Sequence, residues 1–201
     1  MKTQLLLFEE PEYEIIAGTD EAGRGPLAGP VYAACVVLPK DFPFEILNDS
    51  KKLTEAKRLE AEKIIKERAL SYFIASSSHD EIDNINILNA SLLAMRRALI
   101  GVIKDMKKKN LPLPQILLID GNRNFDSPIP CKAIVKGDSK VHEIMAASIL
   151  AKTERDRFMN EMAKKYPEYG FDKHAGYPTA FHKEALRKYG PCPIHRLTFK
   201  F

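Results

Sequence analysis

The chain has 201 residues, of which 45% are hydrophobic and 29% are charged, and its formal net charge is +4. These proportions are typical of one compact globular domain and exclude a long disordered region. No run reaches the roughly 18 uncharged apolar residues that a membrane-spanning helix needs. The apolar part of residues 1–8 is also shorter than the roughly 7–15 residues of a signal-peptide core. We therefore expect a cytoplasmic protein whose first eight residues form a frayed start or a first strand.

The charge is unevenly distributed along the chain. Residues 131–201 carry 14 Lys and Arg against 8 Asp and Glu, whereas residues 1–130 carry 17 against 19. A basic surface beside an acidic pocket suits a metal-dependent enzyme that acts on a polyphosphate. The asymmetry alone is weak evidence, because many proteins show it without binding nucleic acid.

The three cysteines do not predict a disulfide framework, since their number is odd and none is closely paired. Cys192 and His195 form a Cys-x-x-His unit. A zinc site would need a second paired unit, which the chain lacks. We favour a small buried thiol and surface histidines.

The predicted elements alternate between strands and helices. Apolar runs predict strands near residues 15–19, 31–38, 71–76, 116–119 and 131–135. Capping residues and apolar stripes predict helices near 54–69, 88–106, 141–166 and 178–189. The first two strands are joined by a glycine-rich turn and should form a hairpin. With no internal repeat and no linker, the pattern predicts one α/β domain over residues 1–201, built on a mixed sheet.

Acidic residues follow three of these predicted strands. Asp20 and Glu21 end the first strand, Asp120 ends the run at 116–119, and Asp138 follows the run at 131–135. Where strand ends meet loops, α/β sheets gather their ligands, so neighbouring strands would bring these acids together. Clustered carboxylates repel one another unless divalent cations join them, and hard oxygen ligands favour Mg²⁺ or Mn²⁺ over zinc.

The adjacent pair raises a geometric difficulty. In a regular strand, Asp20 and Glu21 point to opposite faces of the sheet. They can share a metal site only if the strand ends or distorts at this point. Gly18, Gly23 and Gly25 would permit such a distortion.

Each acid also has a simpler interpretation. Asp138 or its neighbour Ser139 would serve as N-cap of the following helix, and we weigh this equally with a metal site. Asp120 would end its strand in an ordinary Asp-Gly turn. Asp156 would pair with Lys152 at helical spacing, and we favour that surface pairing for it.

The glycines at 23–29 suggest a rival function. Their spacing is similar to a dinucleotide-binding fingerprint, but the last interval is one residue too long. A strand rather than a helix should follow, and no Gly-Lys-Ser/Thr is present. We therefore expect these glycines to let the backbone approach a sugar or phosphate closely.

A family resemblance follows from the order of several short blocks. Residues 18–31, Gly-Thr-Asp-Glu-Ala-Gly-Arg-Gly-Pro-Leu-Ala-Gly-Pro-Val, resemble the opening signature of bacterial ribonuclease HII. Further blocks in family order are Asn-Asp-Ser-Lys-Lys-Leu at 48–53, Ile-Asp-Gly at 119–121, Val-Lys-Gly-Asp-Ser at 135–139, Ala-Ala-Ser-Ile-Leu-Ala-Lys at 146–152, His-Ala-Gly-Tyr at 174–177 and Gly-Pro-Cys-Pro-Ile-His-Arg at 190–196. The extra N-terminal domain and Ser-Gly-Lys-Gly turn of the type III enzymes are both missing. Thr-Glu-Arg-Asp at 153–156 and Met145 depart from the family pattern, and both lie away from the four acids.

The resemblance implies a ribonuclease H-like fold with a C-terminal helical extension, in which about residues 170–201 contact the substrate. It implies hydrolysis of the RNA strand of RNA–DNA hybrids and nicking on the 5′ side of ribonucleotides embedded in duplex DNA, leaving 3′-hydroxyl and 5′-phosphate ends. Carried over by position, Asp20, Glu21, Asp120 and Asp138 bind two Mg²⁺ or Mn²⁺ ions. One ion would activate water for in-line attack, and the other would stabilise the leaving oxygen.

The resemblance also implies how the substrate is held. It places the backbone of Gly23, Arg24 and Gly25 at the 2′-hydroxyl, the group that separates RNA from DNA. It places Tyr177 on the sugar at the RNA–DNA junction, although an aromatic in this loop could instead anchor the tail to the core. Phosphate contacts are expected from three lysines, for which solvated charge is the competing interpretation: Lys51, Lys52 and Lys152.

The expected partners are therefore an RNA–DNA hybrid and ribonucleotide-containing duplex DNA, bound by a monomer that has no membrane contact. The runner-up function is a catalytically silent hybrid-binding protein on the same fold. The intact acid set argues against it, because a pure binding protein gains nothing from carboxylates that face phosphates.

Overall fold

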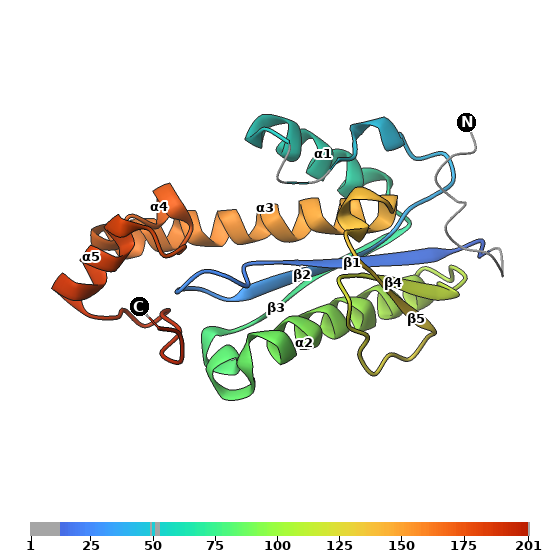
Figure 1. Cartoon of the computed structure of the whole chain (residues 1–201). Helices are drawn as coiled ribbons and strands as arrows, with labels where there is room; N and C mark the ends of the chain where they lie inside the picture. The colour runs from blue at the N-terminus through green and yellow to red at the C-terminus, as the bar shows by residue number, and fades with distance from the viewer. Residues whose placement is uncertain (1–12, 49, 51–52, 201) are drawn as a thin grey trace.

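A mixed five-stranded sheet forms the centre of the molecule, with helices on both faces (Figure 1). The computed structural model describes residues 13–48, 50 and 53–200, so the expectation for residues 1–8 lies outside the described residues. In the order β3-β2-β1-β4-β5, β2 is antiparallel to both neighbours, while β4 and β5 run parallel to β1. The strands are β1 (Ile16–Ala22), β2 (Val31–Val37), β3 (Ser71–Ser77), β4 (Ile116–Asp120) and β5 (Cys131–Ile134). The predicted hairpin and the predicted mixed α/β class are both confirmed.

The helices divide between the two faces of the sheet (Figure 1). α1 (Glu55–Arg68) and α3 (His142–Lys165) cover one face, and α2 (His79–Lys108) covers the other. α4 (Phe171–His174) and α5 (Ala180–Tyr189) lie beyond the C-terminal end of α3. Short 3₁₀ turns connect these elements: η2 (Phe44–Ile46), η3 (Gly137–Ser139) and η4 (Pro167–Tyr169).

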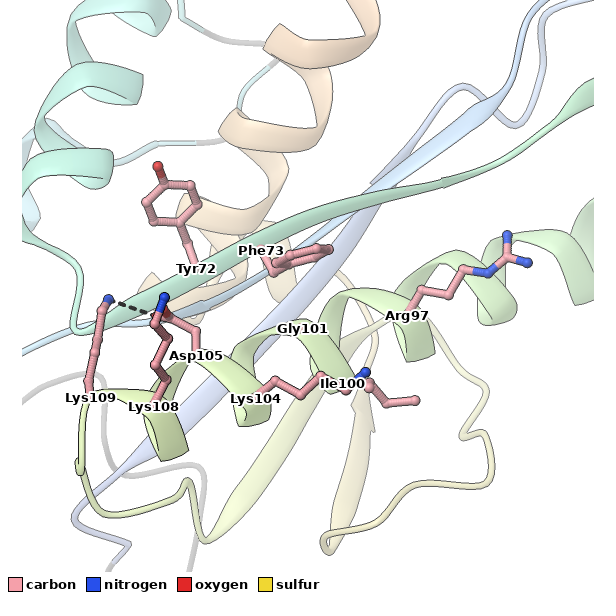
Figure 2. Close-up of a pocket in the computed structure, with 9 residues that line it drawn as sticks. All are labelled: Tyr72, Phe73, Arg97, Ile100, Gly101, Lys104, Asp105, Lys108 and Lys109. Atoms are coloured by element: carbon pink, nitrogen blue, oxygen red, sulfur yellow. Dashed lines mark ion pairs between the residues drawn. The ribbon is translucent and has the colours of Figure 1, made fainter.

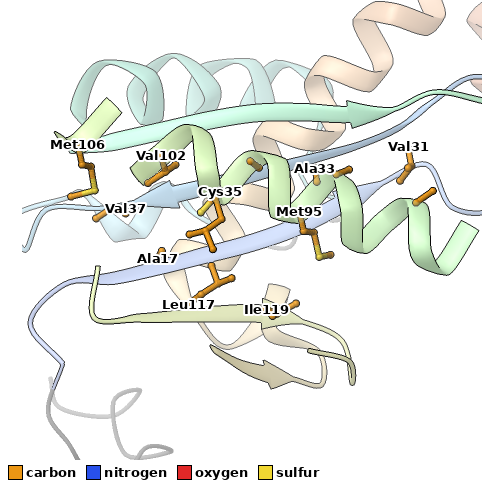
Figure 3. Close-up of a cluster of buried hydrophobic side chains, with 14 of the residues drawn as sticks. Ala17, Val31, Ala33, Cys35, Val37, Met95, Val102, Met106, Leu117 and Ile119 are labelled. Atoms are coloured by element: carbon orange, nitrogen blue, oxygen red, sulfur yellow. The ribbon is translucent and has the colours of Figure 1, made fainter. Parts of the chain in front are cut away.

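α2 packs the main hydrophobic core against the sheet. Its buried stripe, including Met95, Leu99 and Val102, contacts β1 and β2 residues such as Ala17 and Cys35 (Figure 3). By length and composition alone, α2 is apolar enough to cross a membrane, although it contains no uncharged run of the length that a spanning helix needs. That stripe faces the sheet, as the stripe of any core helix does.

α2 also starts earlier than its apolar stripe predicts. Ser78 caps it by accepting the Glu81 N–H, and the Glu81 carboxylate accepts the Ser78 N–H in return. This capping box satisfies two N-terminal donors of the helix. Asn86 then interrupts the helix with φ 65° and ψ 164°. The polar segment 80–86 is therefore a separate first portion of α2 rather than a loop.

On the other face, α3 lies very close to β1. Residues 144–151 of α3 are all buried, and most are small or aliphatic. Gly18 makes this approach possible, because a Cβ at that position would overlap the backbone of Glu143. Since Asp20 is two residues further along β1, it points to this same face, toward α3.

The C-terminal elements form a third cluster around the turn that follows β1. Leu27 and Ala28 from that turn pack with Met159 of α3 and with residues of α4, α5 and the last segment, including Phe171 and Ile194. Backbone hydrogen bonds join Leu27 N–H to Gly176 and Gly29 N–H to Ile194, each at 2.8 Å. The end of the chain is therefore built against the turn near its beginning.

A groove of about 730 Å³ runs between β3, at the edge of the sheet, and the C-terminal half of α2 (Figure 2). The Phe73 ring lies across Gly101, where a Cβ would overlap it. Lys104 and Lys108 line the groove, and an ion pair of 2.7 Å joins Asp105 to Lys109. None of the predicted site residues that the structure describes lines this groove.

Candidate active site

Three of the four predicted acids converge. One carboxylate oxygen from each of Asp20, Asp120 and Asp138 can be chosen so that all three lie within 4.8 Å of one another. Asp20 is on β1, Asp120 ends the parallel neighbour β4, and Asp138 lies in η3, which follows β5. The expectation that neighbouring strand ends bring these acids together is confirmed.

Asp120 shapes the loop that carries Asp138. Its Oδ1 accepts the N–H of Gly137 at 2.7 Å and the N–H of Asp138 at 3.3 Å. The alternative that Asp138 or Ser139 caps α3 is wrong, because the N-cap is Val141 and no side chain caps that end. The 3₁₀ turn therefore directs Asp138 toward the other acids rather than toward the helix.

Asp20 and Glu21 lie in an undistorted part of β1. β1 keeps its register with β2 through Ala22, so Asp20 and Glu21 alternate as in any regular strand. On the other side, pairing between β1 and β4 ends at Thr19. Glu21 therefore has no neighbouring strand on that side, and it lines the same pocket as Asp20 and Asp120. Glu21 therefore reaches the pocket without a glycine-induced distortion, but it is not part of the cluster that Asp20, Asp120 and Asp138 form.

Asp20 is the most deeply buried acid, with 5% of its surface exposed. Its carboxylate accepts the Glu21 N–H at 2.7 Å and is hydrogen-bonded to the Ser148 side chain. The Ser148 hydroxyl in turn lies 2.9 Å from the Ser50 hydroxyl. Burial raises the pKa of Asp20 well above its usual value, and the charges of Glu21 and Asp120 raise it further.

Burial and neighbouring negative charge also raise the pKa of Glu21, but less than that of Asp20. Burial and the nearby Asp120 raise its pKa, while Arg24, whose guanidinium lies 3.4 Å from the Glu21 carboxylate, acts in the opposite direction. A cation shared by these oxygens would relieve both the burial and the repulsion. A compact set of carboxylates with hard oxygen donors therefore fits a divalent metal such as Mg²⁺ or Mn²⁺.

A pocket of about 470 Å³ joins Asp20, Glu21 and Asp120 to the predicted substrate contacts. Gly23, Arg24, Gly25, Lys152 and Tyr177 all line it. The Tyr177 ring is 46% exposed, and its Cε1 would lie 3.4 Å from a Cβ at Gly25. Tyr177 is therefore not a core anchor, because its ring faces the pocket beside the glycine turn.

The predicted lysines differ in what the structure shows. Lys152 forms an ion pair of 2.6 Å with Asp156, which confirms the expected pairing at helical spacing. Arg58 contacts the same carboxylate at 3.4 Å and donates to the Ser50 carbonyl, so this pair belongs to the pocket wall rather than to a solvated surface. Lys51 and Lys52 lie outside the described residues.

Sequence reasoning missed several residues at this site. Ser50 and Ser148 carry no signal beyond their place in the short blocks, since an isolated serine is common in helices and loops. Arg155 and Arg196 are long cations that sequence patterns place at the surface, yet they are 1% and 0% exposed. Cys192 and His195 form no zinc unit, because His195 Nδ1 accepts the Cys192 N–H and its Nε2 lies 3.0 Å from His182 Nε2.

A mixed sheet that delivers carboxylates from neighbouring strand ends into one pocket defines a metal-dependent nuclease of ribonuclease H-like fold. Comparison with known families narrows the class. The family model of ribonuclease HII matches residues 17–201. The chain belongs to the ribonuclease HII family, and it is an endoribonuclease H that depends on divalent metal.

Relatives and solved structures agree with this assignment. The chain is 52% identical to ribonuclease HII of Caldanaerobacter subterraneus subsp. tengcongensis, covering 98% of this chain and 80% of that protein. It is 48% identical to ribonuclease HII of Vibrio parahaemolyticus, covering 99% and 91%. The crystal structure of ribonuclease H2 from Pyrococcus horikoshii OT3 superposes with a TM-score of 0.69 at 26% identity, covering 92% and 94%. A Bst-RNase HIII structure in complex with Mn²⁺ has the same fold, with a TM-score of 0.72 at 18% identity, covering 92% and 67%.

Proposed function

We propose that this enzyme uses Asp20, Glu21, Asp120 and Asp138 to hold two Mg²⁺ or Mn²⁺ ions and nicks duplex DNA on the 5′ side of an embedded ribonucleotide. It would also hydrolyse the RNA strand of RNA–DNA hybrids, leaving 3′-hydroxyl and 5′-phosphate ends. The observation that carries this proposal is the convergence of three carboxylates within 4.8 Å of one another, two of which, Asp20 and Asp120, line a pocket that also holds the glycine turn and an exposed tyrosine.

The four acids have distinct positions around the pocket. Asp20 is held by Ser148 and by the Glu21 N–H, so its carboxylate is fixed before any ligand arrives. Asp120 is fixed by two backbone donors. Divalent ions bound to such carboxylates supply water activation and charge stabilisation at the leaving oxygen. The protein's own contribution is to fix the ligands and orient the substrate.

The substrate contacts follow from the same pocket. The backbone of Gly23, Arg24 and Gly25 would read the 2′-hydroxyl, because only a ribonucleotide offers that donor and acceptor. The exposed Tyr177 ring would pack against the sugar at the junction. Lys152 would contact a phosphate together with Lys51 and Lys52, and its ammonium is held in the pocket wall by Asp156.

We further propose that the chain acts as one domain and as a cytoplasmic monomer, with about residues 170–201 contacting the substrate. Tyr177 supports this portion's role, since it reaches the pocket from the loop between α4 and α5. A metal site alone would not need an excess of positive charge, and the net +6 of residues 131–201 suits a polyanionic partner.

The decisive experiment is cleavage of a DNA duplex that contains one ribonucleotide, with Mg²⁺ or Mn²⁺ and with a chelator. We expect a metal-dependent nick on the 5′ side of the ribonucleotide and no nick in the matched all-DNA duplex. The Asp20→Asn variant should bind the duplex without cutting it, while Asp126→Asn, at an exposed site away from the acids, should cut normally. Binding by the intact protein without any metal-dependent nick would instead support the silent hybrid-binding function.

A further inference from the structure

Arg196 holds the turn that follows β1. Its side chain is fully buried, and its guanidinium donates four hydrogen bonds to backbone carbonyls. Nε donates to Gly29 at 2.9 Å, and one terminal nitrogen donates to Arg24 at 2.9 Å and to Pro26 at 2.7 Å. The other terminal nitrogen donates to Gly23 at 2.6 Å. A single side chain therefore fixes four carbonyls within seven residues.

This arrangement determines where the N–H groups of the turn point. In a trans peptide unit, the C=O of one residue and the N–H of the next point in opposite directions. Because the carbonyls of Gly23 and Arg24 point inward to Arg196, the N–H groups of Arg24 and Gly25 point outward. Within the described part of the chain, neither N–H donates to a backbone carbonyl outside regular elements. Both residues line the pocket, so the turn presents two adjacent donors to it.

Arg155 supports the same turn from the side of α3. Its side chain is 1% exposed, and one terminal nitrogen donates to the carbonyls of Ala28 and Ala175 at 3.2 and 3.0 Å. Its guanidinium fills the space beneath Gly23, where a Cβ would overlap Nε. The Arg155 Nε is itself buried without a hydrogen-bond partner. Residue 23 must therefore be glycine for two reasons: a Cβ would overlap the Arg155 side chain, and its φ of 102° is unfavourable for other residues.

Simple packing does not account for these two cations. Among the described residues, neither guanidinium forms an ion pair with a carboxylate, although buried charges are normally paired. Burial, together with the charge of Arg155, lowers the pKa of Arg196 to about 9. An apolar side chain would fill either space at lower cost in free energy, but it would donate nothing to the turn.

We propose that Arg196 and Arg155 are positioning residues for sugar discrimination. They hold the carbonyls of residues 23–29 inward, so that the Arg24 and Gly25 N–H groups face the substrate sugar. The proposal rests on the proposed function, because it needs this turn to read the 2′-hydroxyl. It makes Arg196 a determinant of ribonucleotide specificity, although the Arg196 side chain is buried beneath the turn and does not line the pocket.

The test uses the full chain carrying Asp20→Asn, which should bind a duplex without cutting it. It compares the affinities of this protein for two duplexes. One duplex is all DNA, and the other is identical except for a single ribonucleotide. The variants are Arg196→Lys and Arg155→Lys, which keep the positive charge and remove the guanidinium fork. Arg157→Lys is the matched control, because Arg157 lies on the same helix and pairs with Glu62 and Glu154 at the surface. Phe199→Leu controls for stability, since the Phe199 ring packs against the Arg196 guanidinium at 5.1 Å.

We expect Arg196→Lys to lower the preference for the ribonucleotide duplex by at least about tenfold, as hydrogen bonds to a charged donor are lost. The affinity for the all-DNA duplex should not change, and Arg157→Lys and Phe199→Leu should keep the preference. If Arg196→Lys loses thermal stability to the same extent as Phe199→Leu and keeps the preference, the proposal is overturned. If Arg196→Lys does not fold, Arg155→Lys decides in the same way, because it leaves the four bonds of Arg196 in place. If the Asp20→Asn protein with both arginines intact does not prefer the ribonucleotide duplex, then the proposed recognition of the 2′-hydroxyl by the turn is itself wrong.

Discussion

The Oδ1 atom of Asp120 accepts the N–H of Gly137 at 2.7 Å, so the acid that ends β4 fixes the loop that carries the next acid. The two carboxylates at Asp120 and Asp138 are therefore unequal. Asp120 faces the acid cluster and also accepts two backbone N–H groups, whereas Asp138 faces the cluster from the loop that Asp120 holds. We expect Asp120→Ala to destabilise the protein by about 1–3 kcal/mol, because two buried donors lose a charged acceptor. Asp138→Ala should destabilise the protein less, because it leaves both backbone hydrogen bonds to Asp120 in place.

In both of these variants the cleavage rate should fall by more than roughly 100-fold. Loss of a group that only hydrogen-bonds to a metal ligand lowers activity by roughly 10–100-fold, and these variants lose a proposed ligand itself. Urea unfolding and cleavage rates, measured on the same preparations, separate the two effects. Equal destabilisation by Asp120→Ala and Asp138→Ala would contradict the asymmetry.

Ser148 should matter to activity although it binds no substrate. Its hydroxyl is hydrogen-bonded to Asp20, and removal of such an outer partner lowers metal affinity or activity by roughly 10–100-fold. Ser91→Ala is the matched control, because Ser91 is equally buried in a core helix and bonds to the Ile87 carbonyl on the far face of the sheet. Mn²⁺ titration calorimetry and cleavage rates should change for Ser148→Ala and stay constant for Ser91→Ala.

Asp20→Asn should stabilise the metal-free protein while it abolishes cleavage. Burial and the charges of Glu21 and Asp120 raise the pKa of Asp20, so its charged form is disfavoured in the folded chain. Near neutral pH, a neutral amide removes that penalty, and each 1 kcal/mol gained raises Tm by roughly 2–4 °C in a chain of this size. Thermal unfolding with chelator should show the rise. With Mn²⁺ the order should reverse, because metal at about 100 times its Kd stabilises only the intact site, by about 2.7 kcal/mol. A lower Tm for the variant in chelator would show that the acids do not repel one another.

Gly18 and Gly101 offer a direct comparison of two glycine contacts. A Cβ at Gly18 would meet the Glu143 backbone, whereas a Cβ at Gly101 would meet only the half-exposed Phe73 ring. Backbone cannot move aside as a side chain can, so we expect Gly18→Ala to destabilise by at least about 1–3 kcal/mol through overpacking. Gly101→Ala should change stability by less than about 1 kcal/mol, because the ring can rotate and alanine favours the helix. Denaturant midpoints measure both, and equal losses would count against this account of the β1–α3 contact.

The buried histidines predict how stability depends on pH. Burial lowers the pKa of His195 from 6.5 to about 4, so the unfolded chain binds a proton there more readily than the folded protein does. The stabilisation by neutral His195 is therefore complete above pH 6.5 and is lost as the pH falls toward 4. The loss amounts to at most roughly 3 kcal/mol. His195→Gln should flatten the decline in unfolding free energy between these pH values, and an unchanged slope would exclude His195 as its source.

Much of the fold could be predicted because the spacing of hydrophobic residues determines which segments form strands and which form helices. The apolar run 116–119 is indeed a strand buried on both faces, and the stripe from residue 88 to 106 does face a sheet. The start of α2 was missed because its first turns are polar, and their helical state depends on the Ser78–Glu81 capping box.

The acids could be predicted because each follows an apolar run at a strand end. Their arrangement could not be fully explained, since the sequence shows no sign that the pairing between β1 and β4 stops at Thr19 and leaves Glu21 without a partner strand on that side. The burial of Arg155 and Arg196 could not be predicted from the sequence, for a different reason. Their partners are backbone carbonyls far away in the chain, and carbonyl groups leave no residue signature.

The contact between Arg196 and Gly23 spans 173 positions of the chain. During synthesis, the ribosome makes the β1 acids and the glycine turn early, yet it must add the residues of the whole sheet before the guanidinium that holds the turn emerges. A nascent chain can therefore form the β1–β2 hairpin long before the turn has its final shape. The timing of translation itself keeps this nuclease incomplete until its last segment has folded back onto its first.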